Sequence, residues 1–210
     1  MKITDPKINK NLTETNLQLI TNRLYYDLLI KDINIDFDIR EAEFNGCHFI
    51  NVDFTNKKLK DIDFIDCIFE KCNLEFLDFS NRSIHRCCFK NCNLTGCNLV
   101  NSSLIDISII NSKCSYINFS DSKIKHFLLR DSVVKEGRFV SLNLENIYFD
   151  NVDFSESEFL NTKLKGIDFS KCNITNIGTT TVDLKGIIIN PEQALMLISL
   201  FGIIVKDFSD

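Results

Sequence analysis

A five-residue period runs through most of this chain and constrains its fold more than any other feature. Taking every fifth residue from Phe44 to Ile189 gives 30 positions, of which 27 are Phe, Leu or Ile. A period of five matches neither the 3.6 residues of a helical turn nor the two-residue alternation of a long strand. Thirteen of the 18 phenylalanines lie in this phase, and we expect them to form the core: Phe44, Phe49, Phe54, Phe64, Phe69, Phe79, Phe89, Phe119, Phe139, Phe149, Phe154, Phe159 and Phe169.

Two other phases show what one repeat does. The phase two residues earlier is mostly small or β-branched, as in Cys47, Val52 and Ile62. The phase two residues later is rich in Asn and Asp, which favour turns. Each pentapeptide therefore reads as a very short strand followed by a turn. One such unit cannot bury its apolar pair alone, so the repeats must stack into a solenoid.

The repeat resembles the pentapeptide-repeat family, whose units place a small residue before Asp or Asn and then Leu or Phe. Closely matching units include Val52-Asp53-Phe54, Cys72-Asn73-Leu74 and Ile167-Asp168-Phe169. The resemblance implies an all-β fold, a right-handed quadrilateral β-helix with four pentapeptides per coil. Thirty repeats then predict about seven to eight coils over residues 41–189.

The two ends predict caps. Residues 1–40 are expected to form an N-terminal capping segment. Leu17, Ile20, Leu24 and Leu28 have helical spacing there, whereas Leu19, Leu24 and Leu29 follow the spacing of five, so a helix is expected for part of the segment at most. Over residues 190–210, Asn190, Pro191 and Gln193 predict a helix start with a capping box, followed by a β-prone tail.

The C-terminal segment is too apolar to cover only one coil, and it resembles the dimerisation module of Qnr and MfpA-type family members. We therefore predict a homodimer, the alternative being that helix and tail fold back on one rod. The expected interface comprises Leu195, Leu197, Ile198, Phe201, Ile203 and Val205.

No catalytic or metal site is predicted, and no cofactor. Seven of the nine cysteines lie in the small inward phase, where a buried Cys acts as a small apolar residue. Cys88 is different, because it lies in an outward phase beside Arg86 and Lys90, an environment that favours a reactive thiol. His48, His85 and His126 belong to no common motif. The recurring Asp residues belong to the repeat itself, so we predict a protein that is not an enzyme.

Charge and hydropathy narrow the location and the partners. The net charge of −5 gives no basic surface for direct binding of nucleic acid. Polar residues at 190–193 interrupt the one long apolar stretch, which argues against a membrane span. Residues 1–10 contain no apolar segment of a secretory signal, so a cytoplasmic location with reduced thiols is expected.

Qnr and MfpA-type relatives bind DNA gyrase or topoisomerase IV by imitating DNA, and they protect these bacterial enzymes from quinolones. The resemblance implies the same partners here. One side of the expected coil carries an acidic excess, through Asp53, Glu75, Glu136, Asp153 and Glu156. The alternative is a protein-interaction scaffold without a topoisomerase role, which would use an apolar or basic surface patch around residues 81–88 or 125–139. The repeat pattern breaks in both segments, either as a bulge or protruding loop used for recognition or as an irregularity that the fold tolerates.

Overall fold

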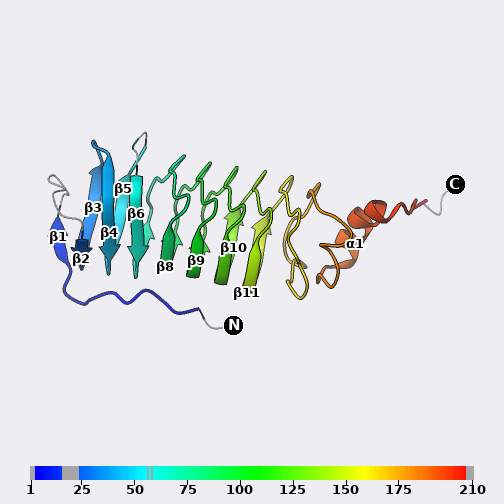
Figure 1. Cartoon of the computed structure of the whole chain (residues 1–210). Helices are drawn as coiled ribbons and strands as arrows, with labels where there is room; N and C mark the ends of the chain where they lie inside the picture. The colour runs from blue at the N-terminus through cyan, green and yellow to red at the C-terminus, as the bar shows by residue number, and fades with distance from the viewer. Residues whose placement is uncertain (1–2, 16–23, 56, 58, 207–210) are drawn as a thin grey trace.

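The chain forms a rod of stacked coils with a short helix at its C-terminal end (Figure 1). The computed structural model describes residues 3–15, 24–55, 57 and 59–206. The elements are β1 (Thr13–Thr15), β2 (Leu24–Tyr26), β3 (Leu28–Asn34), β4 (Ile39–Asn45), β5 (His48–Asp53), β6 (Leu59–Ile65), β7 (Ile68–Glu70), β8 (Ser83–Lys90), β9 (Ser103–Ile110), β10 (Lys123–Val133), β11 (Asn143–Asp153), the helix α1 (Pro191–Leu197) and the 3-10 helix η1 (Ile198–Phe201).

All strand pairs are parallel, and most join residues 20 positions apart, such as Lys123 with Asn143. A coil is therefore four pentapeptides, as the resemblance implied. One ladder makes six such steps, through Asp53, Asn73, Asn93, Lys113, Val133, Asp153 and Asn173. Pairs from Ile39 with Leu59 to Asp168 with Ile188 extend the coils at both ends. The prediction of a parallel β-solenoid is confirmed.

The corners of the coils share one backbone conformation. Asn51, Asp61, Asn91 and Asn111 have φ between 50° and 59°, in the left-handed region. Asn and Asp tolerate this region better than other non-glycine residues. The turn-forming phase of the sequence therefore has a direct backbone cause.

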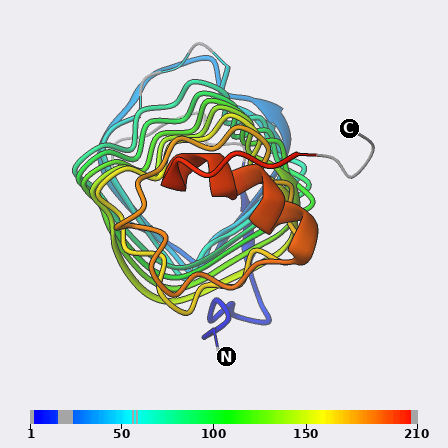
Figure 2. The ribbon, with the colours of Figure 1, turned by 90° about the vertical axis from the view of Figure 1, so that its right-hand side faces the viewer.

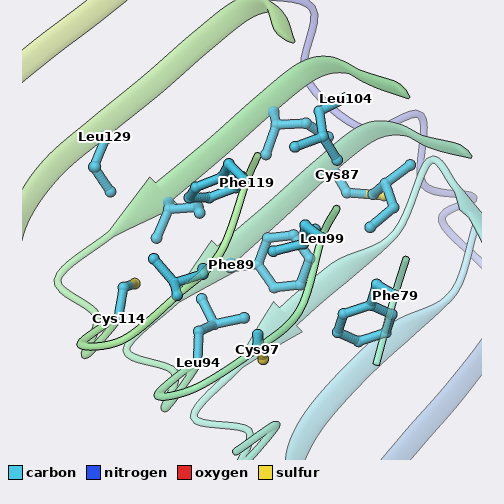
Figure 3. Close-up of a cluster of buried hydrophobic side chains, with 14 of the residues drawn as sticks. Phe79, Cys87, Phe89, Leu94, Cys97, Leu99, Leu104, Cys114, Phe119 and Leu129 are labelled. Atoms are coloured by element: carbon cyan, nitrogen blue, oxygen red, sulfur yellow. The ribbon is translucent and has the colours of Figure 1, made fainter. Parts of the chain in front are cut away.

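The large residue of each pentapeptide points into the tube and stacks on its equivalents in the adjacent coils. The ring centroids of Phe49, Phe69 and Phe89 lie 4.7 and 4.8 Å apart along the rod, close to the spacing of about 4.8 Å between paired strands. All thirteen phase phenylalanines are buried. Side chains therefore fill the tube that looks open in the end-on ribbon (Figure 2) and that Figure 3 shows from within.

The small inward residues bind the backbone of the preceding coil. Ser102 Oγ donates to the carbonyl of Phe79 at 2.9 Å, and Thr162 Oγ1 donates to that of Phe139 at 2.6 Å. Cys67 Sγ makes the same contact with Phe44 O at 3.3 Å. Cys, Ser and Thr recur in this phase because each combines small size with a donor that reaches this carbonyl.

The helical expectation for residues 1–40 is wrong for the part that the structure describes; Leu17 and Ile20 lie outside it. Leu24 begins β2 and Leu28 begins β3, and both strands join the solenoid. Their offset from β4 and β5 is 19 residues, as in Tyr25 with Phe44 and Ile30 with Phe49, so this coil is one residue shorter than those that follow. β1 pairs with β3 at an offset of only 15 residues, as in Thr13 with Leu28. Extended backbone suits β2 and β3 because they must pair with β4 and β5.

Residues 3–12, which we call the N-terminal strap, run back along the outside of the rod (Figure 1). The backbone N–H of Lys7 donates to Asp66 Oδ1 at 2.9 Å, and that of Thr4 donates to Asp106 Oδ1 at 3.0 Å. Asp66 and Asp106 occupy the same corner two coils apart. The strap therefore lies along the row of corner residues formed by Gly46, Asp66, Arg86, Asp106 and His126.

The helix α1 lies across the C-terminal mouth of the tube (Figure 2). Asn190 and Gln193 form the capping box that the sequence indicates. Gln193 Nε2 also donates to the carbonyls of Phe169 and Cys172, at 2.8 and 2.6 Å. Gln193 and Leu197 are the buried residues of α1, and they cover the last coil.

The two segments that break the repeat pattern form no protruding loop. Residues 83–90 are β8, and most of 125–139 belongs to β10. Phe127 fills an inward position and is buried. The guanidinium of Arg82 bonds to Asp61 on the preceding coil, so this inward-phase residue turns to the corner. Both segments keep the ladder register, which agrees with a tolerated irregularity and not with a protruding loop.

Candidate protein-binding face

The five acidic residues predicted as a face lie on one side of the coil and on its corner. Asp53, Glu75 and Asp153 project from the flat side, while Glu136 and Glu156 occupy the next corner at φ of 54° and 63°. The positions follow the 20-residue register, so they run parallel to the rod. We call the side chains of these five residues the acidic face.

Hydrogen bonds with nearby residues hold the side-chain carboxylates at the two ends of the flat side. Asp53 Oδ1 accepts from the N–H of Thr55 at 2.8 Å, and Asp153 Oδ1 accepts from that of Ser155 at 3.0 Å. Burial alone would raise the pKa of Asp153, but the bonds from Ser155 and the nearby Lys135 ammonium outweigh it and lower the pKa. Both are the Asx turns expected of Asp in a tight turn. These carboxylates are fixed in place and face outward.

Lysines interrupt the acidic face. Lys135 Nζ lies 3.6 Å from Asp153 Oδ2, and Lys113 is exposed between Glu75 and Glu136. From Asp53 to Glu156 the face spans about five coil steps, or about 25 Å. Its charge density is therefore about one carboxylate per 5 Å, whereas duplex DNA carries one phosphate per about 1.7 Å of axis. The face is acidic without approaching the charge density of DNA.

Two exposed aromatic residues on this side were missed by the sequence reasoning. Phe76 and Tyr116 occupy the same corner row as Glu136, and their exposed fractions are 72% and 54%. Both residues lie two positions after the large apolar residue, where Asn and Asp are usual, so the periodic pattern of the core does not include them. A bulky aromatic residue at a turn position was the sequence feature that could have identified them.

Three lysines gather near the C-terminal end on another side of the coil. Lys163, Lys165 and Lys185 line a hollow together with Asn161, Val182, Asp183 and Gly186. The acidic face and the lysine-lined hollow therefore lie on different sides of the rod. The net charge of −5 does not reveal that they are separate.

The structure describes the cysteines as free thiols, and the inward ones are buried. Burial raises the pKa of Cys97 to about 12 and of Cys172 to about 11. Cys88 is only half-buried, but burial still raises its pKa, which opposes a reactive thiol at this position. Among the described residues, no group of three His, Cys, Asp or Glu side chains is arranged to hold a metal ion.

The histidines remain apart. His48 Nε2 lies 3.8 Å from Glu70 Oε2, and burial lowers the pKa of His48 despite that carboxylate. His126 Nδ1 lies 3.2 Å from Asp106 Oδ1 beside the N-terminal strap. His85 lies on β8 and belongs to neither pair.

The residues predicted for a dimer interface are divided by the structure. Leu195, Phe201, Ile203 and Val205 are exposed, at 52–61%. Leu197 is instead 6% exposed and Ile198 is half-buried, because this side of the helix packs on the last coil. Only the first four are available to a second copy. In the described part of the chain, no helix is long and apolar enough to cross a membrane.

The fold is a parallel β-solenoid built of pentapeptides, and the acidic face lies on its outside. Residues 82–159 match the family model described as a pentapeptide repeat region, and residues 23–119 match that of the SV2A/B/C luminal domain. The chain thus contains a pentapeptide-repeat region, as its sequence predicted.

Solved structures with this repeat share only low similarity. Full-length QnrB1, described as a plasmid-mediated fluoroquinolone resistance protein, is 18% identical, covers 86% of this chain and 99% of its own, and has a TM-score of 0.35. HetL, a pentapeptide-repeat protein involved in heterocyst differentiation regulation in the cyanobacterium Nostoc sp. strain PCC 7120, is 13% identical over 79% of this chain and 89% of its own, with a TM-score of 0.33. No curated protein matches the chain.

Proposed function

We propose that this chain is a non-enzymatic, protein-binding rod and that the acidic face is its contact surface. The observation that carries the proposal is the alignment of five outward carboxylates along one side of a rigid solenoid. A surface of this kind favours a partner with basic side chains and speeds its approach. The core of the tube is closely packed, so the binding chemistry must lie on the outside.

The finer proposal names the partner as DNA gyrase or topoisomerase IV, with an effect on quinolone sensitivity. It follows the resemblance of the repeat and the C-terminal segment to Qnr and MfpA-type proteins. The second candidate is a scaffold for a different protein partner. The low charge density of the acidic face favours this second candidate over close imitation of DNA.

A supercoiling assay with purified gyrase, with and without ciprofloxacin, tests the finer proposal. If gyrase is the partner, micromolar protein should inhibit supercoiling without the drug or rescue it in the presence of the drug. Glu136→Lys should weaken the effect. Asp121→Lys is the matched control, because Asp121 is also an exposed corner residue with positive φ but lies on a different corner. No effect of the folded protein in either condition would reject gyrase as the partner.

We also propose that two rods join through their C-terminal segments in the cytoplasm. Leu195, Phe201, Ile203 and Val205 are exposed apolar residues in the segment that follows the last coil. Exposed apolar surface of this kind is typical of an interface between subunits. A dimer would place two acidic faces on one long assembly and increase the avidity for a symmetric partner.

A further inference from the structure

One corner row of the rod combines exposed aromatic rings with carboxylates. It consists of Phe76, Gly96, Tyr116, Glu136 and Glu156, one residue per coil. The N–H of Phe76 donates to Thr95 O at 2.9 Å and that of Tyr116 donates to Lys135 O at 2.8 Å. These bonds keep the row straight. We call it the aromatic–acidic row.

The glycine in this row makes room for the first aromatic ring. A Cβ added to Gly96 would lie 2.3 Å from Cδ1 of Phe76, so the phenyl ring lies directly over Gly96. The ring is still 72% exposed. Its position is therefore fixed by the backbone beneath it while one side stays open to solvent.

Carboxylates flank the aromatic pair. Glu75 adjoins Phe76, and its Oε2 lies 3.4 Å from Asn93 Nδ2. The nearby Glu136 carboxylate raises the pKa of Tyr116. Glu156 follows one coil further along the row. An aromatic face with nearby carboxylates is the environment that a guanidinium group prefers, because it stacks on the ring and bonds the acid.

The N-terminal strap leaves this row uncovered. The strap lies along the corner of Asp66 and Asp106, which is ten residues, or half a coil, away from the corner of Phe76 and Tyr116. The two corners are thus diagonally opposite. Both aromatic residues also have positive φ, 57° and 61°, a conformation that is uncommon for bulky residues. Exposed aromatic side chains at such positions need a reason beyond the stability of the rod.

We propose that the aromatic–acidic row is the docking site for an extended, arginine-bearing segment of the partner protein. The inference rests on the proposed protein-binding function and specifies the chemistry of its partner. Phe76 and Tyr116 are two coils apart, or about 10 Å. In an extended segment of polyproline II type, three residues span about 9 Å and return to the same side of the chain, so arginines at every third position would reach both rings in register.

A labelled peptide with arginine at every third position tests the proposal by fluorescence anisotropy at low ionic strength. Phe76→Ala and Tyr116→Ala should each weaken binding about three- to ten-fold, the effect expected for losing one cation–π contact. Tyr148→Ala is the matched control, because Tyr148 is 43% exposed on another side of the coil, and it should leave binding unchanged. A peptide with the same arginines at irregular spacing should bind less tightly.

The outcomes separate this inference from the proposed function. Equal peptide affinity for wild type and the Phe76→Ala and Tyr116→Ala variants, with all proteins folded by circular dichroism, overturns it. Absence of binding to the wild type at millimolar peptide also overturns it, even where gyrase is bound. Peptide binding that depends on both rings supports it, and a negative gyrase assay then rejects only the named partner.

Discussion

Replacing Phe69 by Ala tests whether the stacked phenylalanines hold the coils together. Phe69 is fully buried, with ring centroids 4.7 Å from Phe49, 4.8 Å from Phe89 and 5.1 Å from Phe64. Removing a buried Phe side chain costs about 3–5 kcal/mol. Each aromatic pair contributes only about 0.5–1.5 kcal/mol, so the loss of ring stacking is already included in the cost of removing the side chain. We therefore expect a loss of about 4 kcal/mol.

The assay is urea unfolding followed by circular dichroism, with Phe76→Ala as the control. That variant removes the same atoms from a side chain that is 72% exposed, and it should change the free energy of unfolding by less than about 0.5 kcal/mol. Because each coil contacts only its neighbours, the loss can appear as early unfolding of the N-terminal coils. Equal effects of the two substitutions would falsify the packing argument.

The remaining predictions concern the strap, the thiols and the C-terminus. Burial opposes ionisation of Asp66, but Arg86 and the backbone N–H of Lys7 in the strap lower the pKa of Asp66. The strap should therefore be docked at neutral pH and released as the pH falls through this lowered pKa. Hydrogen exchange of residues 3–12 would detect the release. Because burial raises the pKa of Cys97 to about 12, a thiol reagent at pH 8 should modify it only after denaturation, and rapid modification of the native protein would contradict its burial. Phe201→Glu should convert a dimer to monomers in light scattering, and a wild type that is already monomeric would refute the C-terminal interface.

The repeat made the core predictable because one physical requirement recurs every five residues. A side chain at an inward position must fill the tube, so Phe, Leu and Ile recur there, and corners need left-handed backbone, so Asn and Asp recur there. Leu144, Thr179 and Ile189 are the phase positions that the structure leaves half-buried. Thr179 already departs from the pattern of Phe, Leu or Ile at every fifth position. Leu144 and Ile189 match that pattern, and their partial exposure depends on the neighbouring coils.

The N-terminal strap and the shorter coils at the N-terminal end could not be predicted in this way. Residues 3–12 have no five-residue phase, and their position depends on the acceptors of Asp66 and Asp106, which are distant in the sequence. The spacing of leucines in the first 40 residues matched a helix as well as a strand. Pairing with β4 and β5 decided between them, and that contact is tertiary.

Functional residues are hard to find in such a fold for a related reason. The periodic constraint acts on the inward and corner positions, so the most regular features of the sequence describe stability. Outward positions are free to vary, and they can carry binding chemistry without disturbing the ladder. Phe76 and Tyr116 are informative because they occupy corner positions where the backbone favours Asn, Asp or Gly, yet neither ring is buried. Departures from the repeat that the core does not explain are therefore the residues to test first for partner binding.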